Sequence, residues 1–169
     1  MATAEKIKVL TAQQIEQKIQ RIAHEIYENY HQEKKIVLVG IAHRGYEFAN
    51  RLKDILSQIA EFEITFGQMT IDKDAPLDHP IHTDLDDETW VNQPVLLVDD
   101  VLNSGHTLAY AVRHILGFPV KSLKTVILVN REHHRYPVTA DFVGLNLATT
   151  MQEHISVDFS KKSEGVYLL

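Results

Sequence analysis

Two adjacent carboxylates followed by a short hydroxyl-bearing turn are the residues of this sequence best suited to chemistry. Asp99 and Asp100 come directly after the apolar run 95–98, and the turn 104–107 follows two apolar residues and Asn103. A carboxylate accepts hydrogen bonds from vicinal hydroxyl groups, whereas hydroxyl and backbone N–H groups donate hydrogen bonds to anions. The segment therefore combines an acceptor for a polyol with a cradle for an anion.

A buried strand and a helix must position this segment. The short apolar run 95–98 is typical of a strand covered on both faces of a parallel sheet. A helix is expected over about 107–116, and Gly117 with Pro119 would end it. Ligands of open α/β sheets bind beyond the carboxyl ends of the strands, and a helix N-terminus attracts phosphate. Since Gly105 lets the backbone approach a phosphate closely, the segment matches a ribose 5-phosphate.

Each part of the segment also has an ordinary structural interpretation. Paired aspartates at a strand end are often solvated or serve as caps, and a Ser-Gly turn before a helix is often a plain N-cap. The conjunction of an apolar run, Asp-Asp, two apolar residues and x-Ser-Gly-x-Thr is much rarer. This conjunction is what favours a binding site.

Strand and helix patterns alternate along the rest of the chain, which predicts an α/β fold with a mainly parallel sheet flanked by helices. Thr11 and Gln14 form the pattern of a capping box before an amphipathic helix that ends near Tyr30. A second helix is expected after Gly45. Further strands are expected at 36–39, 63–71 and 125–129. We expect one domain over residues 1–169.

The segment 72–93 interrupts this alternation. It is rich in proline and acidic residues and has little periodicity. A loop of this length inside a compact domain is usually functional or disordered. It is therefore a candidate lid over the site, or alternatively a disordered acidic loop. Trp90 is expected to have a packing role, with stacking on a bound base as the alternative.

Composition and charge narrow the functional classes. Lys plus Arg minus Asp plus Glu gives 17 − 23 = −6, which disfavours a protein that coats nucleic acid. The absence of cysteine excludes disulfides, thiolate metal sites and a Cys nucleophile. The first six residues lack a basic-then-apolar signal, and no apolar run is long enough to span a bilayer. We therefore expect a cytoplasmic protein without a membrane partner.

Ten histidines raise the question of a metal site. His79 and His82 are three residues apart, and His133 and His134 are adjacent, but no third ligand stands at a suitable spacing. We predict surface histidines and no metal site made by the protein alone. The cluster Arg131–Arg135 is expected to be a solvated turn, with phosphate or RNA binding as the alternative.

Residues 95–107 resemble the phosphoribosyl pyrophosphate signature of type I phosphoribosyltransferases, and residues 39–45 resemble the pyrophosphate loop of the same family. Residues 22–25 and 131–144 are similar to the pyrimidine operon attenuator proteins that double as uracil phosphoribosyltransferases. The resemblance implies the type I phosphoribosyltransferase fold. It further implies a small hood, built from about 130–169 together with the N-terminal part.

The resemblance also implies a role for each site residue. Asp99 and Asp100 would hold the ribose hydroxyls, and Arg44 would supply fixed positive charge at the pyrophosphate; these three are the expected catalytic residues. Mg²⁺ would bind mainly through phosphoribosyl pyrophosphate, consistent with its preference for phosphate and water ligands. A homo-oligomer is expected. The other residues expected to bind the donor are Ala42, His43, Gly45, Asn103, Ser104, Gly105, His106 and Thr107.

The implied reaction joins a nucleobase to phosphoribosyl pyrophosphate and gives a nucleoside monophosphate and pyrophosphate. Purine enzymes of this type carry an acid where Asn103 stands, and an amide is no general base near neutral pH, which favours uracil over a purine. One alternative is a nucleotide-sensing, RNA-binding attenuator with little catalysis. Asn103 and a loop whose only cation is Lys73 favour it, whereas the net charge disfavours it. A receiver domain, whose acids close the first strand, is a further and less favoured alternative.

Overall fold

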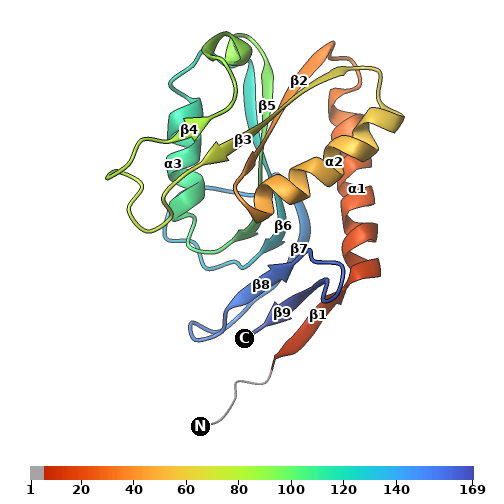
Figure 1. Ribbon diagram of the computed structural model, residues 1–169, viewed down its shortest axis with the longest axis vertical. Coiled ribbons are helices and arrows are strands. Elements are labelled where there is room, and N and C mark those ends of the chain that lie inside the picture. Colours follow the sequence, from red (N-terminus) through yellow and green to blue (C-terminus); the bar gives the residue numbers. More distant parts are fainter. Residues whose placement is uncertain (1–5) are drawn as a thin grey trace.

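The computed structural model describes residues 6–169 and contains a main sheet of six strands in the order β4-β3-β2-β5-β6-β7 (Figure 1). Strands β3, β2, β5, β6 and β7 are parallel neighbours, and β4 pairs with β3 in the antiparallel direction. The predicted α/β class with a mainly parallel sheet is confirmed. The strands are β2 (Lys35–Ile41), β3 (Glu63–Thr70), β4 (His82–Thr83), β5 (Pro94–Leu102), β6 (Ser122–Asn130) and β7 (Phe142–Asn146).

Helices cover both faces of this sheet. Helices α1 (Ala12–Tyr30) and α2 (Arg44–Ile59) lie on one face, and α3 (His106–Ile115) lies on the other (Figure 1). Successive strand residues point to opposite faces, so Leu38 packs in the core under α1 and α2 while Val39 packs in the core under α3. Burial on both faces explains why the central strands are continuous apolar runs.

The predicted capping box of α1 is present. The Thr11 backbone N–H donates to Gln14 Oε1 at 2.9 Å, and the Gln14 N–H donates to Thr11 Oγ1 at 3.2 Å. Across residues 6–169, every helix is too short or too polar to cross a membrane. The expectation about a leader signal concerns the first six residues, of which the first five lie outside the described part of the chain.

A second, antiparallel sheet joins the two ends of the chain. Its strands are β1 (Ile7–Thr11), β9 (Gly165–Leu168) and β8 (Ile155–Asp158), in the order β1-β9-β8. Strand β8 contacts β5, so this sheet lies near the strand that carries the carboxylates. Strand β1 gives no local signal in the sequence, because its pairing partner is more than 150 residues away. Strands β8 and β9 fall within the range 130–169 predicted to build a hood, and β1 within the N-terminal part, whereas β7 of the same range belongs to the main sheet.

The segment 72–93 is not one continuous loop. Its second half is packed: Leu85 lies against Gly67, and the fully buried Trp90 stacks on Phe118 with ring centroids 5.8 Å apart. The predicted packing role of Trp90 is confirmed. Residues 72–81 instead lie beside α3, outside the main sheet (Figure 1). The candidate lid is therefore narrowed to residues 72–81.

A close backbone contact at Gly45 sets the position of α2 relative to β5. A Cβ atom built on Gly45 would lie 2.8 Å from Asp99 Oδ1 and 2.8 Å from the Val98 carbonyl oxygen. Both distances are far shorter than ordinary carbon–oxygen contacts. Glycine is therefore required here by the approach of the helix to the end of β5.

We predict that Gly45→Ala destabilises the protein by about 1–3 kcal/mol, because its methyl group must displace β5 backbone or the Asp99 carboxylate. Urea unfolding of the variant and the parent measures the difference. Gly117→Ala is the control, since a Cβ there meets one atom, the His114 carbonyl oxygen, at 3.1 Å. Equal losses in the two variants would contradict the proposed contact.

Candidate active site

The paired carboxylates lie in the last third of β5 and are both buried. Asp99 is 4% exposed and Asp100 is 5% exposed, and the Asp100 N–H donates to Asp99 Oδ1 at 2.9 Å. Burial and the neighbouring Asp100 carboxylate raise the pKa of Asp99 well above its ordinary value, and the Lys73 ammonium opposes them by lowering it. Asp99 therefore holds its proton to higher pH than an exposed aspartate, which keeps the charge of the pair low.

The turn after β5 is held in one shape by glycine and by a neighbouring loop. Gly105 has a φ of 86°, in the left-handed region, and a Cβ there would lie 2.5 Å from Val138 Cγ2. The Ser104 carbonyl oxygen accepts hydrogen bonds from the N–H groups of Arg135 at 2.7 Å and Tyr136 at 3.2 Å. Helix α3 begins at His106, and its first N–H groups have no acceptor within the helix. The turn is therefore held in a fixed shape with free N–H groups at the start of α3, and its role as an anion cradle stays a prediction.

His106 is enclosed by two aromatic rings. Its ring centroid lies 5.0 Å from that of Tyr110, one turn along α3, and 5.1 Å from that of Tyr136. The His106 N–H donates to Ser104 Oγ at 3.3 Å. These contacts link the turn both to α3 and to the connection between β6 and β7.

A cavity of about 330 Å³ brings together five of the eleven predicted site residues from distant parts of the chain. The lining does not include Asp99, Gly45 or residues 104–107. Its wall contains Ala42, His43 and Arg44, which connect β2 to α2 and include a cis peptide bond between Ala42 and His43. Asp100 and Asn103 come from β5 and the turn after it. Three further wall residues are Lys73 from the candidate lid, Val101, and Ile155 from β8. Cationic, anionic and apolar groups thus face one volume.

A second cavity, of about 410 Å³, adjoins the first at Asn103, which lines both. It also contains Ser104, the connection 131–135, and the exposed side chain of Met151. Sequence reasoning gave Val101 no role beyond its place in the motif, and it missed the apolar residues Met151 and Ile155. A single apolar residue outside a motif gives no signal of its own, and only folding brings Met151 and Ile155 beside the turn.

Arg131 differs from its expected role. The cluster Arg131–Arg135 was expected to be a solvated turn, but Arg131 is only 8% exposed. Its Nε donates to Thr149 Oγ1 at 2.5 Å and its Nη2 donates to the Thr150 carbonyl oxygen at 2.7 Å. His133 Nε2 also contacts the Thr149 carbonyl oxygen. For Arg131 the prediction was wrong, because tertiary folding closes the segment after β7 over its side chain.

Of the two histidines His79 and His82, the first lies in the candidate lid beside a carboxylate, and the second belongs to β4. His79 Nδ1 lies 3.0 Å from Asp72 Oδ2. Within residues 6–169, no group of three or more His, Asp or Glu side chains is arranged to hold a metal ion.

We predict that Asp99→Asn stabilises the protein by on the order of 1–3 kcal/mol near pH 8 and by much less near pH 4. As the pH rises above the unfolded pKa of about 3.9, the unfolded chain releases this proton while the folded chain retains it, so the aspartate costs stability that an amide does not. Urea unfolding at both pH values measures the difference. The exposed Asp54→Asn on α2 is the control. A gain at pH 8 no larger than that at pH 4 would contradict the raised pKa.

Sequence comparisons agree with this geometry. The Phosphoribosyl transferase domain family matches residues 7–163. The bifunctional protein PyrR of Actinobacillus pleuropneumoniae is 35% identical over 160 residues, which cover 90% of this chain and 89% of the relative. The pyrimidine operon regulatory protein of Lactococcus lactis is 36% identical over 168 residues, which cover 95% of this chain and 92% of the relative.

Solved structures show the same fold. A hypoxanthine phosphoribosyltransferase of Trypanosoma cruzi superposes with a TM-score of 0.75 at 18% identity, over 96% of this chain and 90% of that one. A hypoxanthine-guanine phosphoribosyltransferase of Bacillus anthracis gives 0.70 at 20% identity, over 83% and 82% of the two chains. The domain match over nearly the whole chain, together with relatives at about 35% identity, shows the family. This protein belongs to the phosphoribosyl transferase domain family and is a phosphoribosyltransferase related to the pyrimidine operon regulatory proteins.

Proposed function

We propose that the protein transfers the phosphoribosyl group of phosphoribosyl pyrophosphate to a nucleobase, with uracil favoured over a purine. The observation that carries the proposal is the cavity in which Asp100, Arg44 and Lys73 meet, next to the anion cradle of residues 104–107. A ribose bearing one phosphate and one pyrophosphate requires these groups in this arrangement. It needs acceptors for hydrogen bonds from the ribose hydroxyls in the middle, and groups that bind anions on either side.

The proposed donor lies across the carboxyl ends of β2 and β5. The ribose hydroxyls donate to Asp100 and Asp99, and the 5-phosphate accepts from the N–H groups and hydroxyls of residues 104–107. The pyrophosphate lies against residues 42–45, where Arg44 and Lys73 offset its charge. During transfer the bond from the anomeric carbon to pyrophosphate breaks, a bond to a ring nitrogen forms, and the proton of that nitrogen passes to the released pyrophosphate or to water. Cations on the pyrophosphate side therefore stabilise the leaving group.

The carboxylates fit a Mg²⁺ ion that arrives with the donor. Two adjacent carboxyl groups, one with a raised pKa, form an incomplete ligand set for an octahedral ion. Pyrophosphate oxygens, ribose hydroxyls and water would complete it. Held there with the donor, Mg²⁺ would supply positive charge against the leaving group. It would also favour the ionised form of Asp99, which the protein alone disfavours.

We infer that the nucleobase binds where the two cavities meet. Val101 and Ile155 line one side of this junction and Met151 lines the other, which provides apolar contact for a planar ring. The Asn103 amide offers one acceptor and two donors, so it can pair with the alternating C=O and N–H groups of uracil. An amide cannot take up a proton near neutral pH. A nucleobase whose ring proton must be handled by an acidic side chain at this position is therefore disfavoured.

A panel of bases tests the reaction. We expect pyrophosphate release from phosphoribosyl pyrophosphate and Mg²⁺ in the presence of uracil, and release at least about tenfold slower with hypoxanthine, guanine, xanthine, adenine or orotate, because one lost polar pair costs about 1.4 kcal/mol or more. Faster turnover with a purine would overturn the base assignment. Donor binding without turnover on any base would favour the nucleotide-sensing alternative, and filter binding of pyrimidine-leader RNA at several salt concentrations would then test it.

Substitution of Asp100 tests the donor site. Asp100→Asn should weaken binding of phosphoribosyl pyrophosphate with Mg²⁺ by about 10- to 100-fold, because a charged acceptor for the ribose hydroxyls is lost while the size of the side chain is kept. Isothermal calorimetry measures the affinity, and Asp54→Asn is the control for loss of one negative charge. Unchanged affinity in a folded Asp100→Asn variant would show that the donor binds elsewhere.

A further inference from the structure

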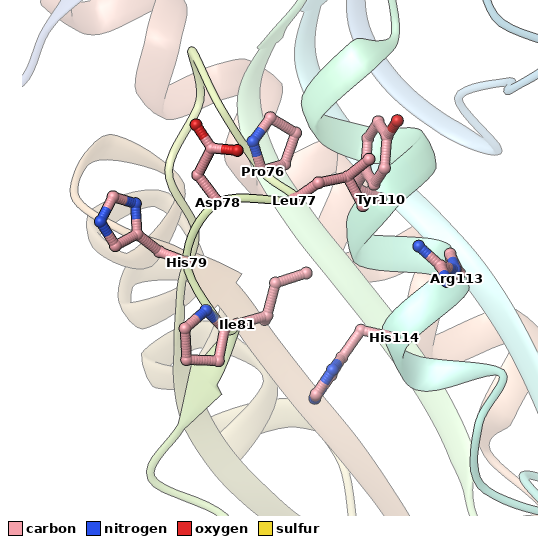
Figure 2. Close-up of a pocket in the computed structure, with 9 residues that line it drawn as sticks. Pro76, Leu77, Asp78, His79, Ile81, Tyr110, Arg113 and His114 are labelled. Atoms are coloured by element: carbon pink, nitrogen blue, oxygen red, sulfur yellow. The ribbon is translucent and has the colours of Figure 1, made fainter.

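A cavity of about 560 Å³ lies between the candidate lid and α3, away from the site described above. Figure 2 shows its two walls: Pro76, Leu77, Asp78 and Ile81 on the lid side, and α3 on the other. This volume is within the range of sites for small organic ligands. The proposed reaction does not involve the residues that line this cavity. The α3 wall consists of Tyr110, Arg113 and His114.

Opposite charges stand on the two walls, with apolar groups between them. Arg113 projects from the last turn of α3, and Asp78 lies on the lid across the cavity (Figure 2). Leu77, Ile81 and the Tyr110 ring lie between these charges. An arginine fork binds phosphate, a carboxylate accepts hydrogen bonds from sugar hydroxyls, and apolar groups pack on a planar base. Together these groups fit the three parts of a nucleotide.

His114 is a weaker anion partner than Arg113. Burial lowers the pKa of His114, while the Asp87 carboxylate raises it. Its ring also packs edge-on against Phe118, with centroids 6.0 Å apart. Arg113 is exposed, and its guanidinium fork matches the geometry of a phosphate, so it is the residue on which an anion at this cavity would depend.

Two connections link this cavity to the active site. The lid residues that form one wall begin three residues after Lys73, which lines the donor cavity beside Asp100. On the other wall, the Tyr110 ring packs edge-on against His106 of the phosphate cradle. A ligand between the lid and α3 therefore contacts both elements that must be placed correctly for the donor to bind.

We propose that this cavity is a second nucleotide-binding site, distinct from the site of phosphoribosyl transfer. The phosphate binds Arg113, the ribose faces Asp78, and the base packs on Leu77, Ile81 and Tyr110. A nucleotide bound there holds residues 76–81 against α3 and keeps Lys73 from moving further over the donor. Occupation of the cavity therefore lowers the rate of phosphoribosyl transfer.

The binding test separates this site from the active site, where a product nucleotide also binds. Calorimetry with UMP or GMP is performed on the Asp100→Asn variant, whose donor site is impaired, and on wild-type protein saturated with phosphoribosyl pyrophosphate and Mg²⁺ without a base. We expect one nucleotide per chain to bind in both. Adding Arg113→Gln should weaken this binding at least tenfold, whereas the exposed Lys162→Gln, on the turn between β8 and β9, should leave it unchanged.

Several outcomes would overturn the proposal. These are the absence of binding in both preparations, binding that Arg113→Gln leaves intact, and inorganic phosphate or uridine alone binding as tightly as the nucleotide. The binding result does not depend on whether any nucleobase is a substrate. Failure of the proposed reaction would therefore not contradict the second site, and failure of the second site would not contradict the reaction.

Turnover provides the regulatory test. Wild-type protein should lose activity at least threefold as the nucleotide rises to saturation, and raising the donor concentration should restore it only in part. Arg113→Gln should have normal activity without the nucleotide and should be inhibited only competitively with the donor. Equal inhibition of both proteins would show that the nucleotide acts at the donor site alone.

Discussion

The approach of Gly45 to the end of β5 is the contact on which the rest of the site depends. With no side chain on Gly45, the start of α2 lies directly against the Val98 backbone and the Asp99 carboxylate. The connection 42–44 is thereby placed beside Asp100, in the same cavity. A larger residue would separate the loop that is proposed to bind pyrophosphate from the carboxylates that are proposed to bind ribose.

This contact also creates an electrostatic cost. Asp99 is buried beside Asp100, and both burial and the like charge raise the pKa of Asp99. Left without a ligand, two buried carboxyl groups are destabilising, and Lys73 provides only partial compensation. A magnesium-bound sugar phosphate would supply the missing positive charge and hydroxyl donors. The site therefore carries a local instability that the proposed substrate would relieve, as is common at functional sites.

Helix α3 is shared by the phosphate cradle and the cavity beside the lid. Its first turn carries His106, and its last turn carries Arg113 and His114. The face between them holds Leu108, Ala111 and Ile115 against the sheet. Because the helix is anchored along this buried face, the proposed coupling between the two cavities would pass through Tyr110 and through residues 72–81, rather than through movement of the helix as a whole.

The sequence by itself determined the parts whose signal is local. The apolar runs marked β2, β5 and β6, the capping box marked the start of α1, and the ordered segment from Asp99 to Thr107 identified the carboxylates and the cradle. Each depends on neighbours a few residues apart, so spacing and residue type are sufficient. The resemblance to the family rested on the same segments, and the family match confirmed it.

Tertiary structure alone decided the features that depend on distant partners. Strand β1 exists because β9 pairs with it from the other end of the chain, and Arg131 is buried because the segment after β7 accepts its hydrogen bonds. The sequence predicted a packing role for Trp90, but only the tertiary structure identifies Phe118 as its stacking partner. The meeting of Lys73, Asp100 and Ile155 in one cavity follows from the order of the strands. Local periodicity carries no information about such contacts, because their energy comes from surfaces that only the folded chain brings together.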